Sequence, residues 1–309
     1  MFDFVVAIPS FRRPQGLERL LRALAALDTE ARMRVLVADN DAELRQAEAL
    51  CRRIASEPYR WPLDAIVVSE RGIAQARNAL VERVLADPAI RFVAMLDDDE
   101  WPRPDWLDAL LRAQTASGAD VVHGSVLREF ETVPPRWARG WEGIAEIRCA
   151  SGQQEMLDGI GNVLIRRAVL EALEKPCFDD SFGMTGGEDK DFFVRLRSAG
   201  ARFVHADEAV VYEHVPATRT RLRWLLMRSF RTGNTDMRIA LKYRATFGAR
   251  SLEFAKIAAA FAAVPILSVA GSFTPERRLD GVYKLFRAAG KVAALLGHRY
   301  DEYATIHGK

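Results

Sequence analysis

The sequence contains few cysteines and no segment typical of export. Its three cysteines, Cys51, Cys149 and Cys177, are far apart, so no CxxC spacing occurs. This pattern argues against a disulfide framework and a cysteine-rich zinc site, and a reducing compartment is expected. The N-terminal MFDFVVAIPSFRRP has a short apolar run without a basic leader or a cleavage site. It therefore predicts a buried strand rather than a signal peptide, and the expected location is the cytoplasm.

The chain also lacks a strong net charge, internal repeats and low-complexity segments. Its 309 residues carry a formal charge of +2, with 49% hydrophobic and 28% charged residues. These values are typical of a globular chain that forms one large domain, or one domain with an appendage. No nucleic-acid partner is expected.

Short apolar runs alternate with helix-like segments over the first hundred residues. The runs lie at 4–9, 33–38, 65–69 and 91–96, and the helix-like segments at 17–27, at 43–56 and after Gly72. Such alternation predicts an α/β fold, a mixed but mainly parallel sheet flanked by helices. Ligands bind at the carboxyl ends of the strands in sheets of this kind. The polar clusters at 9–12, 39–41 and 97–99 fall at those ends, so we expect them to converge on one crevice.

The C-terminal part is basic and then apolar. Residues 219–250 contain nine basic residues and one acid, Asp236, and are followed by the apolar run 254–273 and the amphipathic segment 281–297. The apolar run has the length of a bilayer span, about 20 residues, but Lys256, Pro265 and many alanines make its insertion marginal. A pair of helices at a membrane surface is the favoured interpretation. A helical cap packed on the sheet is the alternative.

Three consecutive aspartates, Asp97, Asp98 and Asp99, directly follow an apolar run. Carboxylates this close repel one another, and a divalent cation that joins them to a pyrophosphate relieves the repulsion. Magnesium or manganese binds nucleotides with few protein ligands in this way. A solvated turn or helix cap is the alternative, and the position after a buried strand argues against it.

Two further groups are candidates for chemistry. Gly186-Gly187-Glu188-Asp189 combines glycines, which allow unusual backbone angles, with acids at a predicted helix start. A carboxylate there could act as a general base, although an acidic helix cap needs no function. His214 could complete a metal shell, but a lone histidine is more often structural. Arg12, Arg71 and Arg77 are candidates for phosphate contacts near the predicted crevice.

Taken together, these motifs resemble family 2 glycosyltransferases with the GT-A fold, particularly those that assemble bacterial exopolysaccharides such as succinoglycan. The resemblance covers about the first 215 residues and depends on the order and spacing of its motifs. They are IPSFRRP (8–14), VADND (37–41), ERGIAQARNALV (70–81), MLDDDEWPRPDWL (95–107), GNVLIRR (161–167), GGEDKDFFVRL (186–196) and VYEHV (211–215).

The resemblance implies a role for each candidate on the donor side. Pro9, Ser10 and Arg12 would line the nucleotide pocket, Asp39 would contact the uracil or ribose, and Arg77 would also lie on the nucleotide side.

The resemblance also divides the acidic residues by role. Asp97 and Asp99 would bind the metal, with Asp99 the firmer ligand, and Asp98 would touch the ribose or donor sugar. His214 matches a metal-ligating histidine of some relatives. Asp189 would be the general base and Glu188 would bind the acceptor.

One departure from the family concerns processivity. Processive members carry a QxxRW motif, whereas residues 220–224 of this chain read TRLRW. The missing glutamine indicates transfer of a single sugar, and Arg221 or Arg223 could contact the diphosphate or an anionic acceptor.

The resulting expectation is a catalytic domain over 1–218 and a basic, amphipathic helical region over 219–309. The enzyme would be an inverting glycosyltransferase that uses a UDP-sugar and Mn²⁺ or Mg²⁺. Its acceptor would be a glycan, which could be lipid-linked, at the inner face of the cell membrane. The alternatives are a nucleotidyltransferase, although IPSFRRP lacks the glycines of its phosphate loop, and a non-catalytic nucleotide-sugar-binding protein.

Overall fold

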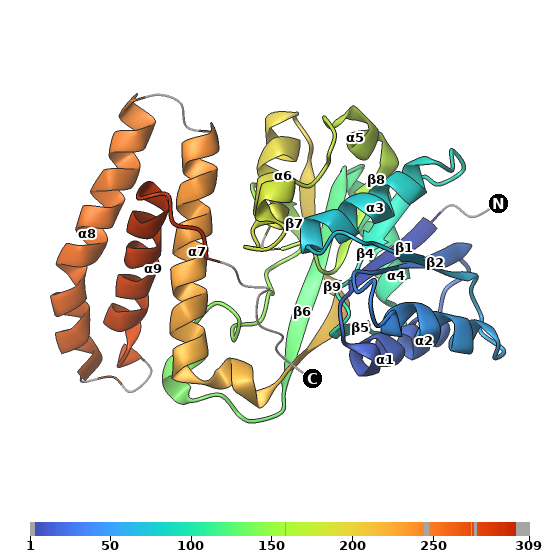
Figure 1. The fold of residues 1–309 in the computed structure, drawn as a ribbon, viewed down its shortest axis with the longest axis horizontal. Coiled ribbons are helices and arrows are strands. Elements are labelled where there is room, and N and C mark those ends of the chain that lie inside the picture. The colour runs from blue at the N-terminus through green and yellow to red at the C-terminus, as the bar shows by residue number, and fades with distance from the viewer. Residues whose placement is uncertain (1–3, 158, 244–246, 273, 275–276, 301–309) are drawn as a thin grey trace.

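A mixed β-sheet with helices on both faces forms the centre of the computed structural model (Figure 1). The structure describes residues 4–157, 159–243, 247–272, 274 and 277–300. The strands are β1 (Phe4–Ser10), β2 (Met33–Asp39), β3 (Leu63–Val67), β4 (Phe92–Met95), β5 (Glu100–Pro102), β6 (Val121–Phe130), β7 (Gly152–Gln154), β8 (Val163–Arg166) and β9 (Phe203–Val215). The α-helices are α1 (Pro14–Ala25), α2 (Gln46–Ala55), α3 (Ile73–Leu85), α4 (Trp106–Ser117), α5 (Arg167–Ala172), α6 (Glu188–Ser198), α7 (Leu222–Tyr243), α8 (Phe247–Ser272) and α9 (Asp280–Leu295). Short 3₁₀ turns are η1 (Arg136–Ala138), η2 (Asp180–Phe182) and η3 (Ala217–Thr220).

The strand order is β3-β2-β1-β4-β8-β6-β9-β5, with β7 paired to β9. The strands β3, β2, β1 and β4 run parallel to one another, and β6 runs parallel to β9. The pairs β4–β8, β6–β8, β5–β9 and β7–β9 are antiparallel. The expected α/β fold with a mixed, helix-flanked sheet is thus confirmed. The fully parallel half is the part in which strands and helices alternate along the sequence.

Both faces of β1 are buried, which explains why its sequence is apolar without alternation. Val6 and Ile8 belong to the core beneath α1, α2 and α4, while Val5 and Ala7 belong to the core beneath α3, α5 and α6. The leucines of α1 recur at helical spacing, so one stripe of this helix is buried against the first of these cores.

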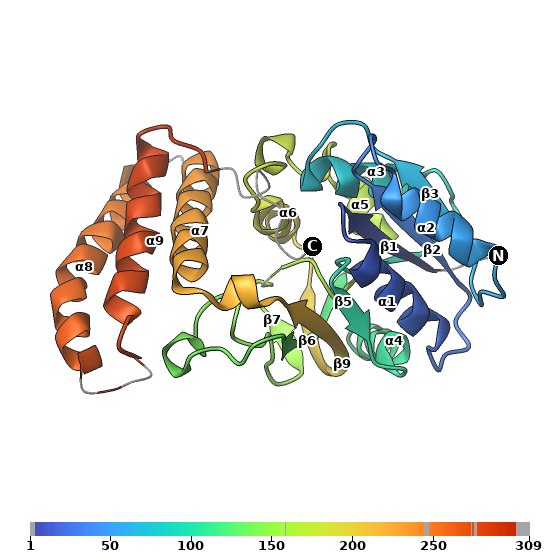
Figure 2. The ribbon, with the colours of Figure 1, turned by 60° about the horizontal axis from the view of Figure 1, so that its bottom comes forward.

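The helices α7, α8 and α9 lie to one side of the sheet, next to α6 (Figures 1 and 2). Where α7 crosses α9, a Cβ added to Gly233 would meet the Arg287 carbonyl oxygen at 1.9 Å, so only glycine allows this approach. Ion pairs attach α7 to α6, because Lys242 of α7 contacts the buried Asp191 at 2.8 Å and Lys190 of α6 pairs with Asp236 of α7.

The predicted division between residues 218 and 219 falls inside η3, which links β9 to α7. Among the described residues, no helix is both long enough and apolar enough to cross a membrane.

Candidate active site

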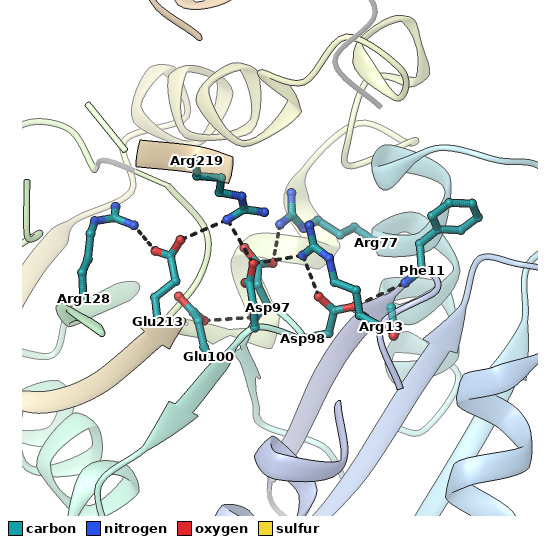
Figure 3. Close-up of polar contacts among 11 residues, drawn as sticks. Phe11, Arg13, Arg77, Asp97, Asp98, Glu100, Arg128, Glu213 and Arg219 are labelled. Carbon is teal, nitrogen blue, oxygen red and sulfur yellow. Dashed lines mark hydrogen bonds and ion pairs between the residues drawn. The ribbon is translucent and has the colours of Figure 1, made fainter. Parts of the chain in front are cut away.

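The polar clusters that follow β1 and β4 meet at one edge of the sheet (Figure 3). The Ser10 hydroxyl, at the end of β1, donates to Asp98 Oδ2 at 2.9 Å, and the Phe11 amide donates to the same oxygen at 3.3 Å. Asp39 ends β2 beside Ser10 in the parallel register. The expected convergence at the carboxyl ends of the strands is therefore present, because parallel neighbours end at the same edge.

Arg13 connects two of the three aspartates. One of its guanidinium nitrogens lies 3.0 Å from Asp98 Oδ1 and 2.9 Å from Asp99 Oδ2. Burial raises the pKa of Asp98 to about 6 despite this arginine. Burial also acts to raise the pKa of Asp99, but Arg13 and Arg219 outweigh it and hold that pKa below its usual value. The pKa values of the adjacent carboxylates are thus shifted in opposite directions, because Asp99 is close to two guanidinium groups and Asp98 to one.

A second group of charges extends from Asp99 toward β6. Arg219, in η3, donates to Asp99 Oδ2 at 3.2 Å and contacts Glu213 Oε1 at 3.5 Å. Glu213 lies on β9 and also pairs with Arg128 of β6. The segment after β9 is therefore held to the aspartates by a chain of alternating charges, and it leads directly into the basic helix α7.

Arg77 connects the aspartates with α6. Its side chain is buried within α3, and it donates to Asp97 Oδ1 at 2.8 Å and to Glu188 Oε1. Glu188 is only 2% exposed. Burial raises its pKa to about 7, although Arg77 acts to lower it. One guanidinium thus spans both acidic clusters that the sequence pointed to.

The start of α6 depends on two glycines, as the sequence suggested. Gly186 and Gly187 have φ of +71° and +99°, a region that favours glycine. A Cβ at Gly187 would also lie 2.1 Å from the Thr235 side chain of α7. Asp189 follows in the first turn of α6 and is half-buried.

Comparison with known sequences identifies the family. Residues 5–173 match the family described as "Glycosyl transferase family 2", and residues 92–286 match "Glycosyl transferase family group 2". The chain is also 36% identical over 238 residues to succinoglycan biosynthesis protein ExoM of Rhizobium meliloti (strain 1021), which covers 76% of this chain and 74% of ExoM. The chain belongs to glycosyltransferase family 2.

Other matches are more distant. The glycosyltransferase is 28% identical over 193 residues to glucosyl-dolichyl phosphate glucuronosyltransferase of Haloferax volcanii, which covers 56% of this chain and 57% of that protein. Among solved structures, it resembles mannosyltransferase PcManGT from Pyrobaculum calidifontis in complex with GDP-Man and Mn²⁺, with a TM-score of 0.64 and 18% identity over 96% of this chain and 87% of that one. S. aureus TarS 1–349 in complex with UDP-GlcNAc gives a TM-score of 0.51 and 13% identity over 97% and 93%. The fold is GT-A, and the expectation of a family 2 enzyme is confirmed. The family assignment thus supports a glycosyltransferase over the two alternatives, a nucleotidyltransferase and a non-catalytic binding protein.

The residues expected on the nucleotide side of this glycosyltransferase lie around the end of β1. Pro9 and Ser10 are the last residues of that strand, and Arg12 has a positive φ of 55° and pairs with Asp41 at 2.6 Å. The Asp39 carboxylate is buried and accepts from the backbone amides of Asp41 and Glu48. Their contacts with a nucleotide stay predictions.

Phe11 follows β1 in the same region and is half-buried. Its ring is close to two arginines, with the Arg12 guanidinium carbon 5.1 Å and that of Arg71 4.7 Å from the ring centroid. Two cations beside an aromatic ring suit a site that receives a phosphate-bearing nucleotide.

The three aspartates alone do not supply a complete set of ligands for a divalent cation. Among the described residues, no three His, Cys, Asp or Glu side chains converge closely enough to hold a metal ion alone. Asp97 and Asp99 supply hard carboxylate oxygens, and the Asp97 side chain is 40% exposed. This donor set suits Mg²⁺ or Mn²⁺ when diphosphate and water oxygens complete the shell. The His214 amide donates to the Asp99 carbonyl at 2.9 Å, which places this residue beside Asp99, and its role as a ligand stays a prediction.

Five further residues of the site are not distinguished by any sequence pattern: Arg13, Arg128, Glu100, Glu213 and Arg219. Buried Glu100 accepts from the Asp97 amide at 2.9 Å, and its burial raises its pKa well above the usual value. Arg13 is adjacent to Arg12 in the SFRRP segment, but nothing in the sequence says which of the two reaches the aspartates. Arg219 was one of nine basic residues in its segment, whereas Arg221 and Arg223, which the motif comparison favoured, are exposed.

Proposed function

We propose that this enzyme transfers a single hexose from a UDP-sugar to a hydroxyl group of a glycan acceptor, with inversion at the anomeric carbon. The observation that carries the proposal is the contact of Arg77 with both Asp97 and Glu188. It joins the end of the sheet that suits a diphosphate to the helix start that carries Asp189. A two-sided site of this kind suits one direct displacement.

Asp189 is the proposed general base. It is half-buried in the first turn of α6 and follows two glycines that let the backbone approach closely. A carboxylate here can take the proton of an acceptor hydroxyl as that oxygen attacks the anomeric carbon. Glu188 was expected to bind the acceptor, but its burial and its pairing with Arg77 favour a different role. We assign it to hold Arg77, and through Arg77 to position Asp97.

Asp97 and Asp99 are the proposed ligands of a Mn²⁺ or Mg²⁺ ion, with His214 as a third candidate. Such an ion, when bound, stabilises the negative charge of the departing diphosphate. Arg13 forms ion pairs with Asp98 and Asp99, and Arg219 forms one with Asp99. They are therefore within the same small region as the incoming phosphates, and guanidinium groups bind phosphate oxygens well.

The names of two relatives support a proposal for the acceptor class. ExoM is named for succinoglycan biosynthesis, and the Haloferax relative acts on a dolichyl phosphate-linked glucose. We propose a lipid-linked oligosaccharide as the acceptor, reached at the cytoplasmic face of the cell membrane. PcManGT binds GDP-Man and TarS binds UDP-GlcNAc, so both nucleotide classes belong in a donor screen.

A nucleotide-release assay tests the proposal. Purified enzyme is incubated with a panel of UDP- and GDP-sugars, with and without manganese, and the anomeric configuration of the product is determined by NMR. A product that retains the donor configuration would exclude direct displacement.

The base is tested separately with Asp189→Asn. This change should lower turnover by about 10²- to 10⁴-fold and leave donor binding, measured by calorimetry, nearly intact. Glu171→Gln, which alters an exposed carboxylate on α5, is the matched control. Turnover of Asp189→Asn near that of the control would remove Asp189 from the base role.

A further inference from the structure

The outer face of α8 is apolar although it is exposed. Phe254 is 53%, Phe261 43% and Ile266 70% exposed. The other exposed residues between 254 and 266 are Ala255, Lys256, Ala258, Ala259, Ala262 and Pro265. Lys256 is thus the one polar side chain among the exposed residues described in this stretch. A helix of a globular protein usually presents polar residues to water, so this face is suited to another apolar phase.

The position of α8 makes the face accessible. In both views α8 is the outermost helix, farthest from the sheet, and α9 and α7 lie between it and the catalytic region (Figures 1 and 2). Its opposite side packs mainly on α9, with Ile257 buried in a small core beside Met237 and Ala294. The exposed apolar residues at 254, 258, 261 and 265, and those at 255, 259, 262 and 266, recur at intervals of three and four residues, so together they form one broad helix face.

The charge of the chain is strongly divided. Residues 222–295 contain 13 Lys and Arg against 4 Asp and Glu, a net charge of 13 − 4 = +9, although the whole chain carries only +2. The remainder therefore carries 2 − 9 = −7. Arg277 and Arg278 are exposed just beyond the C-terminal end of α8, and Lys284 is exposed on α9. An apolar face within a positive region is complementary to a surface with apolar material beneath anionic groups.

We propose that the outer face of α8 docks on an anionic lipid bilayer. Phe254, Phe261 and Ile266 enter the boundary between headgroups and acyl chains, while Lys256, Arg277 and Arg278 contact anionic headgroups. A second copy of this chain fits the face less well, because a symmetric contact would bring two segments of charge +9 together. The proposal rests on the proposed function only in so far as a lipid-linked acceptor gives the docking a purpose.

Vesicle sedimentation of the full chain tests the docking. The probes are phosphatidylcholine vesicles with and without phosphatidylglycerol, at low and high salt. The wild type should bind the anionic vesicles preferentially and lose binding as salt rises. The double variant Phe254→Ser/Phe261→Ser should bind about 100-fold more weakly, since each buried aromatic side chain contributes about tenfold. Leu44→Ser, which changes a 55% exposed leucine beside α2, is the matched control and should bind as the wild type does.

The charged groups are tested by Arg277→Gln/Arg278→Gln, which should reduce the preference for phosphatidylglycerol without changing the weak binding to neutral vesicles. The proposal is overturned if the wild type ignores anionic vesicles at low salt, or if the double phenylalanine variant binds as tightly as Leu44→Ser. It is also overturned if light scattering shows a wild-type dimer that the phenylalanine substitutions dissociate, since the occupant is then a second copy.

Two further measurements separate this proposal from the proposed function. Asp189→Asn should bind vesicles like the wild type, and Phe254→Ser/Phe261→Ser should keep wild-type turnover with a soluble acceptor. If Asp189→Asn lost vesicle binding, Asp189 would have a structural role in docking. If the double phenylalanine variant lost turnover with a soluble acceptor, the α8 face would have a structural role in catalysis.

Discussion

Replacing Arg77 by methionine tests the contact that joins the two sides of the site. The substitution keeps most of the side-chain volume and removes a guanidinium that contacts Asp97 and buried Glu188. Removing one partner of a buried ion pair costs about 3–5 kcal/mol when the other charge stays behind. Here Glu188 has a pKa of about 7 even beside Arg77. Without the arginine its pKa must rise further, so near neutral pH the carboxyl is protonated instead of remaining as an unpaired charge.

The size of the loss should therefore depend on pH. At about pH 6 it should equal the lost charge-assisted hydrogen bonds, about 1.5–3 kcal/mol. The pKa of Glu188 in the folded protein lies above its ordinary value of 4.5. Its neutral form is thus favoured by folding, and the associated stability is present below about pH 4.5 and is lost as pH rises toward and through the folded pKa. In Arg77→Met the pKa of Glu188 in the folded protein is higher still, so the variant continues to lose stability up to a higher pH than the wild type does. Between about pH 6 and pH 8 the deficit of the variant should grow by about 1 kcal/mol.

The assay is urea unfolding of the wild type and Arg77→Met at both pH values, followed by tryptophan fluorescence. Arg52→Met, which removes an exposed i,i+4 partner of Glu48 on α2, is the control and should change stability by no more than about 0.5 kcal/mol. Adding Arg77→Met to a Glu188→Gln background should give a loss without this pH dependence. An equal loss for Arg77→Met at the two pH values would refute the coupling of Arg77 to a titrating Glu188.

Three other outcomes follow from the structure. Asp99→Asn should raise the manganese concentration needed for half-maximal turnover at least about tenfold, and more than Asp98→Asn does; equal effects in a metal titration would contradict the assignment of Asp99 as the firmer ligand. Arg219→Gln should raise the KM for the donor about tenfold with a smaller change in kcat, if its guanidinium moves from Asp99 to the diphosphate; an unchanged KM in steady-state kinetics would leave it a structural role. Gly233→Ala should destabilise the protein by about 1–3 kcal/mol, because the added Cβ meets a backbone carbonyl. Gly140→Ala is the control, since a Cβ at Gly140 has open space around it. Similar melting temperatures for the two variants would contradict the close crossing of α7 and α9.

Local patterns were sufficient for much of the sheet. The runs 4–9, 33–38 and 91–96 correspond to β1, β2 and β4. Each of these strands is buried on both faces, so its sequence is apolar almost without interruption and can be recognised locally. The convergence of the polar clusters at 9–12 and 97–99 also followed from the strand pattern, since parallel strands end at the same edge, and the structure shows it as the contact of Ser10 with Asp98. The mixed half of the sheet was harder, because the antiparallel strand β8 and the long strand β9 pair with strands distant in sequence.

Membership of the family was also contained in local sequence, because the motifs retain their residues, order and spacing. The sequence by itself therefore determined the α/β fold, the chemistry class and the acidic segments at 97–99 and 188–189. Each of these depends on a short segment and the strand or helix directly beside it.

Only the tertiary structure decided which arginines serve those acids. Arg13 rather than Arg12 contacts Asp98 and Asp99, and Arg219, not its exposed neighbours, contacts Asp99. Burial of Glu188 against Arg77, which changes its proposed role, brings together residues 111 positions apart. The reason is geometric: an arginine side chain can reach in many directions from its backbone, and packing of distant helices and loops selects the one that it takes.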